Sequence, residues 1–122
     1  MVEKLARFLL GCILLMVGFN YFLNFLPYPE MTVEAGQFMK ALDETQYMFP
    51  MIKCLELVAA VLFLLNCFVP LATLLILPGI VNIFLFHLFL DQGGLVMGVF
   101  LMGLLGIIMA HHKDAYASLF RL

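Results

Sequence analysis

Charged residues are scarce in this sequence, and neither sign dominates. Of the 122 residues, 11% are charged and 66% are hydrophobic, against about 25% and about 45–50% in ordinary soluble domains. So few polar side chains cannot cover a water-soluble globule of this size, and so many apolar ones exclude a disordered chain. Six Lys and Arg against eight Asp and Glu give a net charge of −2 without a basic stripe, which excludes nucleic acid as a partner. The sequence therefore predicts a protein of the lipid bilayer.

Cysteine is also rare, and its three positions form no known pattern. Cys12, Cys54 and Cys67 are odd in number and lack C-x-x-C or His/Cys spacing, which excludes a disulfide framework and a zinc signature. We interpret them as small packing residues within apolar runs. His111 and His112 are adjacent, so on a helix they diverge by about 100° and cannot readily share one ion. We therefore expect no metal site, and a solvated histidine pair.

What the sequence does contain is long apolar runs. A membrane-spanning helix needs about 20 mostly apolar residues, and four such spans are predicted. Very short connections between the later spans require antiparallel neighbours, and the alternating pattern of barrel strands is absent. The apolar run at the N-terminus continues well past Cys12, so we expect a retained helix rather than a cleaved signal peptide. The predicted fold is an all-α membrane protein in one domain over 1–122, an antiparallel four-transmembrane-helix bundle with spans at about 5–26, 51–68, 71–90 and 95–110.

Lysine and arginine near the span ends predict the orientation. Lys4, Arg7, Lys113 and Arg121 all fall on one side, whereas the other side carries Lys40 and most of the acidic residues. Because cytoplasmic flanks are enriched in Lys and Arg, we expect both termini in the cytoplasm.

The longest connection, between Pro27 and Pro50, has its own pattern. After the extended stretch Pro27-Tyr28-Pro29-Glu30, Thr32 is a suitable N-cap for a helix that runs to about Met48. Its apolar side chains share one face, opposite its charged ones. We expect an interfacial helix over 32–48 on the outer surface, with a solvated loop as the alternative; the apolar face is formed by Phe38, Met39 and Leu42, and the charged face by Lys40, Asp43 and Glu44.

Polar residues within the spans fall in one half of the bilayer. Because successive spans alternate in direction, the late positions of spans one and three lie level with the early positions of span two. An ionisable group at mid-membrane costs about 2.5–3.5 kcal/mol on insertion scales, so Glu56 should face the bundle with Lys53 as its partner. Asp91 follows His87 by four residues and could orient its imidazole. The six polar residues of the outer half are Asn20, Asn24, Lys53, Glu56, Asn82 and His87.

Two interpretations of these residues remain open. They form either a pocket for the head of an amphipathic ligand or a hydrogen-bonded plug that holds three helices in register. Asn82 and His87 are five residues apart, about 140° around a helix, so they need not face the same cavity.

Glycines in the last span predict close helix packing. Small residues let another backbone approach closely, and the partner is either the first span, through Gly11 and Gly18, or another subunit. The glycines of this span and its entry are Gly94, Gly98, Gly103 and Gly106.

Several stretches along nearly the whole chain share residues with a known family. The most specific is Asn82-Ile83 running into His87-Leu88-Phe89-Leu90. The other stretches, in order, are Ala6-Arg7-Phe8-Leu9-Leu10-Gly11, Gly18-Phe19-Asn20-Tyr21-Phe22, Ala35-Gly36-Gln37-Phe38, Glu56-Leu57-Val58-Ala59-Ala60 and Phe68-Val69-Pro70-Leu71-Ala72. With these stretches the chain resembles the DoxX-like family of small membrane proteins. Tyr21 stands where many relatives have a basic residue, so the resemblance does not extend to a proton-relay role there.

The resemblance implies a four-helix protein of a bacterial-type inner membrane and a shared role for Asn20, Glu56, Asn82 and His87. DoxX-like proteins look related to the membrane subunit of thiosulfate:quinone oxidoreductases. This chain lacks a sulfur-handling domain and a paired-cysteine centre, so we expect at most an accessory subunit of an oxidoreductase, not catalytic alone.

The predicted function is a small membrane subunit that binds a quinone-like or lipidic ligand in support of a redox partner. The alternative is a non-enzymatic assembly or stability subunit that docks a larger complex, or a homo-oligomer, through its glycine-lined helix. Transport by one protomer is disfavoured, because neither inverted repeats nor a continuous polar path is evident. The expected ligand-binding residues are Asn20, Asn24, Glu56, Asn82 and His87, supported by Lys53 and Asp91.

Overall fold

The computed structural model describes residues 1–24, 27 and 30–120, and within them every regular element is helical. Four helices are long and apolar enough to cross a membrane, the last of them counted from Gln92. The predicted all-α, four-helix membrane fold is therefore confirmed. The elements are α1 (Val2–Leu23), α2 (Val33–Glu44), α3 (Met48–Leu65), α4 (Val69–Phe89), the 3-10 turn η1 (Gln92–Gly94), α5 (Leu95–His111), α6 (Lys113–Tyr116) and the 3-10 turn η2 (Ala117–Phe120).

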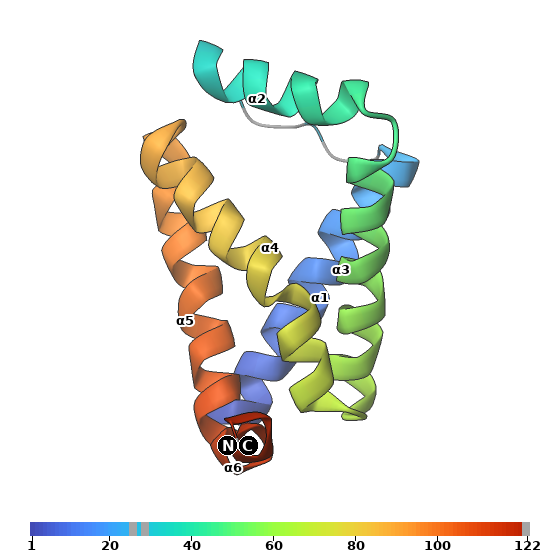
Figure 1. Cartoon of the computed structure of the whole chain (residues 1–122), viewed down its shortest axis with the longest axis vertical. Coiled ribbons are helices and arrows are strands. Elements are labelled where there is room, and N and C mark those ends of the chain that lie inside the picture. Colours follow the sequence, from blue (N-terminus) through green and yellow to red (C-terminus); the bar gives the residue numbers. More distant parts are fainter. Residues whose placement is uncertain (25–26, 28–29, 121–122) are drawn as a thin grey trace.

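The four long helices form an antiparallel ring. α1 packs against α3 and α5, and α4 packs against the same two helices (Figure 1). We call the end that carries α2 the outer end, and the end where α1 begins and α5 ends the inner end. Large apolar side chains also cover the outside of the ring, as a lipid-facing surface requires. The buried core includes Ala6, Leu10, Leu14, Ala59, Ala60, Phe63, Ile76, Ile80, Leu101, Leu105 and Ile108.

Small residues set the register between α1 and α3. A Cβ atom added at Gly11 would lie 2.9 Å from Cδ2 of Leu64, and one at Gly18 would lie 2.7 Å from Cδ2 of Leu57. The step from Gly11 to Gly18 along α1 equals the step from Leu64 back to Leu57 along α3, as expected of an antiparallel pair. The same register places Asn20 level with the start of α3 around residues 53–56.

α3 and α4 each begin earlier than predicted from the sequence, because the prediction placed the helix boundaries at prolines. α3 begins at Met48 with Pro50 inside its first turn, and α4 begins at Val69 with Pro70 as its second residue. First-turn amides lack an intrahelical acceptor, so proline costs nothing there. α1 ends at Leu23, and Asn24 caps it in the left-handed conformation with φ 54°. Residues 25 and 26, where the first span was predicted to end, lie outside the described residues.

α2 confirms the predicted interfacial helix. Thr32 is its N-cap, and the Thr32 hydroxyl accepts a hydrogen bond from the Ala35 amide at 3.1 Å. The helix ends at Glu44 rather than Met48, because Gln46 adopts φ 67° and the Thr45 hydroxyl accepts from the Met48 amide, which starts α3. Phe38, Met39 and Leu42 are partly buried while Lys40, Asp43 and Glu44 are exposed, as predicted. Tyr28 and Pro29 of the preceding stretch lie outside the described residues.

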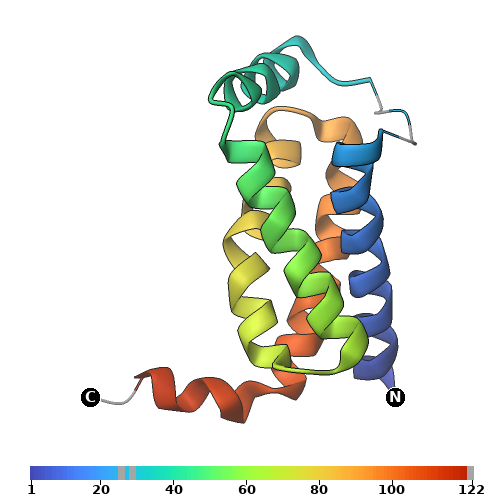
Figure 2. The same ribbon diagram turned by 90° about the vertical axis from the view of Figure 1, so that its right-hand side faces the viewer.

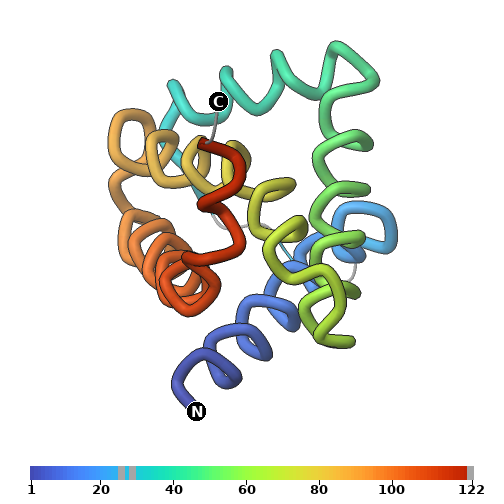
Figure 3. Tube along the Cα trace, turned by 60° about the horizontal axis from the view of Figure 1, so that its bottom comes forward, coloured from blue at the N-terminus to red at the C-terminus, as the bar shows by residue number. Residues whose placement is uncertain are grey.

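A C-terminal segment was not anticipated. After α5 the chain turns away from the bundle axis, and α6 and η2 extend sideways at the inner end (Figures 2 and 3). Arg121, one of the four cations used to predict the orientation, lies outside the described residues.

Candidate functional site

The predicted partner of Glu56 is confirmed. Glu56 is only 7% exposed, and its Oε2 lies 3.3 Å from Nζ of Lys53, one helical turn earlier on α3. The spacing of three residues places both side chains on one face of the helix. The ion pair keeps each charge compensated within an apolar bundle.

Asn20 joins this pair from the neighbouring helix. Its side chain is 7% exposed, and the α1–α3 register brings it level with Lys53 and Glu56. Directly beside it, the Tyr21 ring packs on Phe49 of α3 with the centroids 5.6 Å apart. Asn20, Lys53 and Glu56 together form what we call the α1–α3 polar cluster.

His87 lies on the other helix pair. Its Nδ1 is 3.2 Å from the Asp91 carbonyl oxygen and 3.9 Å from Oδ2 of the Asp91 carboxylate. The predicted contact between the two residues is therefore present. When Nδ1 carries the proton, the ring donates to the Asp91 carbonyl. We call His87 and Asp91 the α4–α5 polar cluster.

Two glycines of the fourth span make room for this histidine. A Cβ atom at Gly94 would lie 2.3 Å from Cε1 of His87, and one at Gly98 would lie 3.3 Å from Cα of Phe84. Both glycines therefore pack against α4 of the same chain. They do not pack against the first span, which was one of the two partners expected from the sequence. The first span uses Gly11 and Gly18 against α3 instead.

The two polar clusters remain on separate helix pairs. The outer ends of α4 and α5 diverge from those of α1 and α3 (Figure 1), and within the described part of the chain no hydrogen bond or ion pair joins His87 to Glu56. α2 bridges them, since it continues directly into α3 and also touches the end of α4. There the Thr32 hydroxyl donates to the Leu90 carbonyl, and the Phe38 ring lies 5.7 Å from that of Phe86.

Two of the expected site residues are turned away. Asn82 is exposed on α4, and Asn24 is exposed as the C-cap of α1. The angle of about 140° between positions 82 and 87 explains why only His87 faces α5. The six polar residues therefore do not all converge: Lys53 pairs with Glu56 on α3 at the level of Asn20 on α1, and His87 contacts Asp91.

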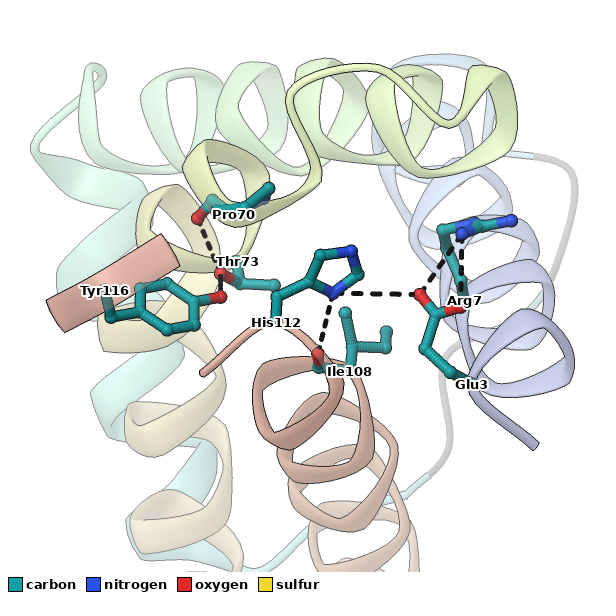
Figure 4. Close-up of polar contacts among 7 residues, drawn as sticks. All are labelled: Glu3, Arg7, Pro70, Thr73, Ile108, His112 and Tyr116. Atoms are coloured by element: carbon teal, nitrogen blue, oxygen red, sulfur yellow. Dashed lines mark hydrogen bonds and ion pairs between the residues drawn. The ribbon is translucent and has the colours of Figure 1, made fainter. Parts of the chain in front are cut away.

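A second polar group, missed by the sequence analysis, lies at the inner end (Figure 4). Glu3 is 6% exposed and accepts from Nη1 of Arg7 at 3.1 Å. His112 is partly buried, and its Nδ1 lies 3.0 Å from the Ile108 carbonyl oxygen and 3.9 Å from Oε1 of Glu3. The expectation of a solvated histidine pair is therefore wrong for His112, whereas His111 is exposed as expected. The spacing of Glu3 and Arg7, four residues apart, was the available signal.

The same inner group anchors the C-terminal segment. Thr73 is fully buried in α4, and its hydroxyl donates to the Pro70 carbonyl at 2.6 Å. The Tyr116 hydroxyl is also hydrogen-bonded to Thr73, and because the Thr73 proton is already used, Tyr116 is the donor (Figure 4).

The two best-defined hollows lie on the lipid-facing surface rather than at these clusters. One, of about 350 Å³, is on α1 and the other, of about 310 Å³, is on α3; both have apolar linings. Among the described residues no group of three His, Cys, Asp or Glu side chains could hold a metal ion. The first hollow is lined by Cys12, Leu15, Met16, Phe19 and Leu23, and the second by Leu57, Val58, Val61 and Leu62.

Comparison with protein-family models, with curated proteins and with solved structures finds no match to this chain. The resemblance to the DoxX-like family therefore stays a prediction from the quoted residues, and the class established by the fold is that of a four-helix membrane protein.

Proposed function

We propose that this protein is a small membrane subunit that binds an amphipathic ligand with a quinone-like head at its outer end. The observation that carries the proposal is the Lys53–Glu56 pair, with Glu56 buried and level with Asn20, at the outer end of a bundle whose buried residues are mostly apolar. Ionisable residues inside membrane spans are costly, and they commonly mark ligand or proton pathways.

The donors and acceptors of the two clusters suit a quinone head. The Lys53 ammonium and the Asn20 amide can donate hydrogen bonds to a ring carbonyl oxygen, and Glu56 can accept a proton from a hydroquinone hydroxyl. His87, held by Asp91, offers a second such group on the opposite helix pair. In this proposal the clusters contact opposite ends of one head.

Aromatic rings flank both clusters. The Tyr21–Phe49 pair accompanies the α1–α3 cluster, and the Phe38–Phe86 pair lies next to His87. Apolar and aromatic walls with a few placed polar groups are typical of small-molecule sites. Phe38 belongs to α2, so α2 would form the roof of the site.

Electrons would come from a membrane redox partner, because this chain supplies only binding and proton-exchanging groups. Following the DoxX-like resemblance, we place the protein in a bacterial-type inner membrane with both termini in the cytoplasm, as an accessory rather than an independently catalytic subunit.

Binding of a short-chain ubiquinone to the purified protein in lipid nanodiscs tests the proposal, with quenching of tyrosine fluorescence as the readout. We expect Glu56→Gln and His87→Ala each to weaken binding about tenfold, or roughly 1.4 kcal/mol. Asn82→Ala, at an exposed polar position of the same helix as His87, is the matched control and should bind like the wild type. Absence of binding, or equal affinity in all variants, would reject the proposal.

A second candidate function is supported by the open side of α5. A Cβ atom added at Gly103 or Gly106 would have no neighbour within 4 Å, so another helix could pack closely there. In this alternative the protein is an assembly or stability subunit. A stoichiometric partner that cross-links to the wild type, is lost on Gly103→Leu and is kept on Val96→Leu would favour it.

A further inference from the structure

The segment Lys113–Phe120 leaves the bundle at the inner end and lies outside the ring of spanning helices. It projects sideways from the end of α5, away from the bundle axis (Figure 2). Its last two described residues are apolar and exposed: Leu119 is 61% exposed and Phe120 is 85% exposed.

Tyr116 fixes which side of the segment faces the membrane. Its hydroxyl reaches Thr73, the fifth residue of α4, which is fully buried about one helical turn inside the bundle. The Tyr116 side chain is therefore directed from the segment toward Thr73 in the first turns of α4 (Figure 4).

The sequence of the segment places an apolar residue on the Tyr116 side. Leu119 follows Tyr116 by three residues, which is one turn of the 3-10 helix η2, so the two side chains share a side. Asp114 and Ser118 lie two residues before and two residues after Tyr116, so both polar side chains are turned away from that side. The side marked by Tyr116 is thus aromatic and apolar.

We propose that Lys113–Phe120 is a lipid-surface anchor, which lies along the inner face of the bilayer with Leu119 inserted at the boundary of headgroups and acyl chains. Lipid is the occupant because the segment begins one residue after the spanning helix α5 ends and is hydrogen-bonded to Thr73 near the start of the spanning helix α4, which keeps it at the surface of the bilayer. The Tyr116–Thr73 hydrogen bond sets the rotation of the segment, and His112, near Glu3, holds its start against α1. The anchor is independent of ligand binding at the outer end.

Fluorescent labels on single cysteines of the full chain test the anchor. In a background with Cys12, Cys54 and Cys67 replaced by alanine, an environment-sensitive NBD label is attached to Leu119→Cys or, as the matched control, to Ser118→Cys. The protein is reconstituted in vesicles of phosphatidylethanolamine and phosphatidylglycerol. We expect the label at 119 to be quenched by nitroxide-labelled lipids, and the label at 118 to be quenched about threefold more strongly by aqueous iodide than the label at 119.

Equal iodide quenching at both positions would overturn the proposal. So would efficient energy transfer between copies labelled at 119, or oxidation of the unlabelled cysteine variants to a disulfide-linked dimer through position 119, because a second copy rather than lipid would then cover this face.

Tyr116→Phe provides a second measurement that removes one hydroxyl and preserves the ring. We expect it to raise iodide quenching at 119 at least twofold without changing the helical content of the protein, since only the rotation of the segment depends on that hydrogen bond. Unchanged quenching would show that Tyr116 does not orient the segment and would overturn that part of the proposal.

Discussion

The imidazole ring of His87 lies directly against Gly94: a Cβ atom at Gly94 would stand 2.3 Å from Cε1 and 2.4 Å from Nδ1 of the ring. Real side chains do not approach so closely, so the position of the histidine depends on the absence of a side chain seven residues later. The turn between α4 and α5, with Asp91 at its start, brings the two residues together.

Gly94→Ala is expected to displace the His87 ring and break its contact with Asp91. Overpacking of this kind costs about 1–3 kcal/mol of unfolding free energy, measurable by denaturant titration in detergent micelles. The ring signals of His87 in an NMR spectrum of ¹⁵N-histidine-labelled protein should shift as well. Gly103→Ala is the control, because its Cβ would meet open space, and alanine should stabilise α5 by up to about 1 kcal/mol. Equal effects of the two substitutions would contradict this account.

Lys53→Met is expected to destabilise the bundle, because it leaves the Glu56 carboxylate buried without its cation. Removing one partner of a buried ion pair costs about 3–5 kcal/mol, whereas removing both is often nearly neutral. The double variant Lys53→Met/Glu56→Gln should therefore recover most of the loss. A thermodynamic cycle over the four proteins gives the coupling energy, and strict additivity would show that the pair does not interact in the folded state.

Thr32→Ala is expected to loosen α2, since the hydroxyl both caps the helix and donates to Leu90 at the end of α4. Loss of an N-cap costs about 1 kcal/mol, and hydrogen exchange of the Ala35 amide should accelerate accordingly. Thr32→Ser retains the hydroxyl and should exchange at nearly the wild-type rate. If the serine variant exchanged as fast as the alanine variant, the hydroxyl would not be responsible.

Glu3→Gln is expected to weaken the inner end by about 1–3 kcal/mol, because Arg7 and His112 lose the carboxylate that faces them. Glu34→Gln is the matched control: it also lies in the first turn of a helix but is exposed, so its effect should stay below about 1 kcal/mol. Thermal unfolding of both variants in the same detergent measures the difference. A larger loss for Glu34→Gln would be inconsistent with the inner polar group.

Local patterns in the sequence predicted contacts that lie within one helix or one turn. The Lys53–Glu56 pair, the His87–Asp91 contact and the Thr32 cap all join residues three or four apart, where helical geometry leaves little choice. Prolines misled the prediction of helix starts, because Pro50 and Pro70 occupy first turns rather than boundaries.

Sequence patterns did not predict how each helix is rotated about its own axis. Most side chains of a membrane span are apolar on every side, so no polar stripe shows which face is buried, and the exposure of Asn82 depends on how α4 packs on α5. The inner polar group was missed for a related reason: its contacts between helices join Glu3 to His112 and Thr73 to Tyr116, which are far apart in the chain.

The sequence by itself determined that this chain forms four apolar helices, since about 20 consecutive apolar residues satisfy their backbone in lipid only as a helix. The tertiary structure alone decided which helices pair, that His87 and Glu56 belong to different pairs, and that the C-terminal segment folds back on Thr73. Those outcomes follow from the close fit of side chains against glycines and from hydrogen bonds between residues far apart in the chain, neither of which is encoded in local spacing.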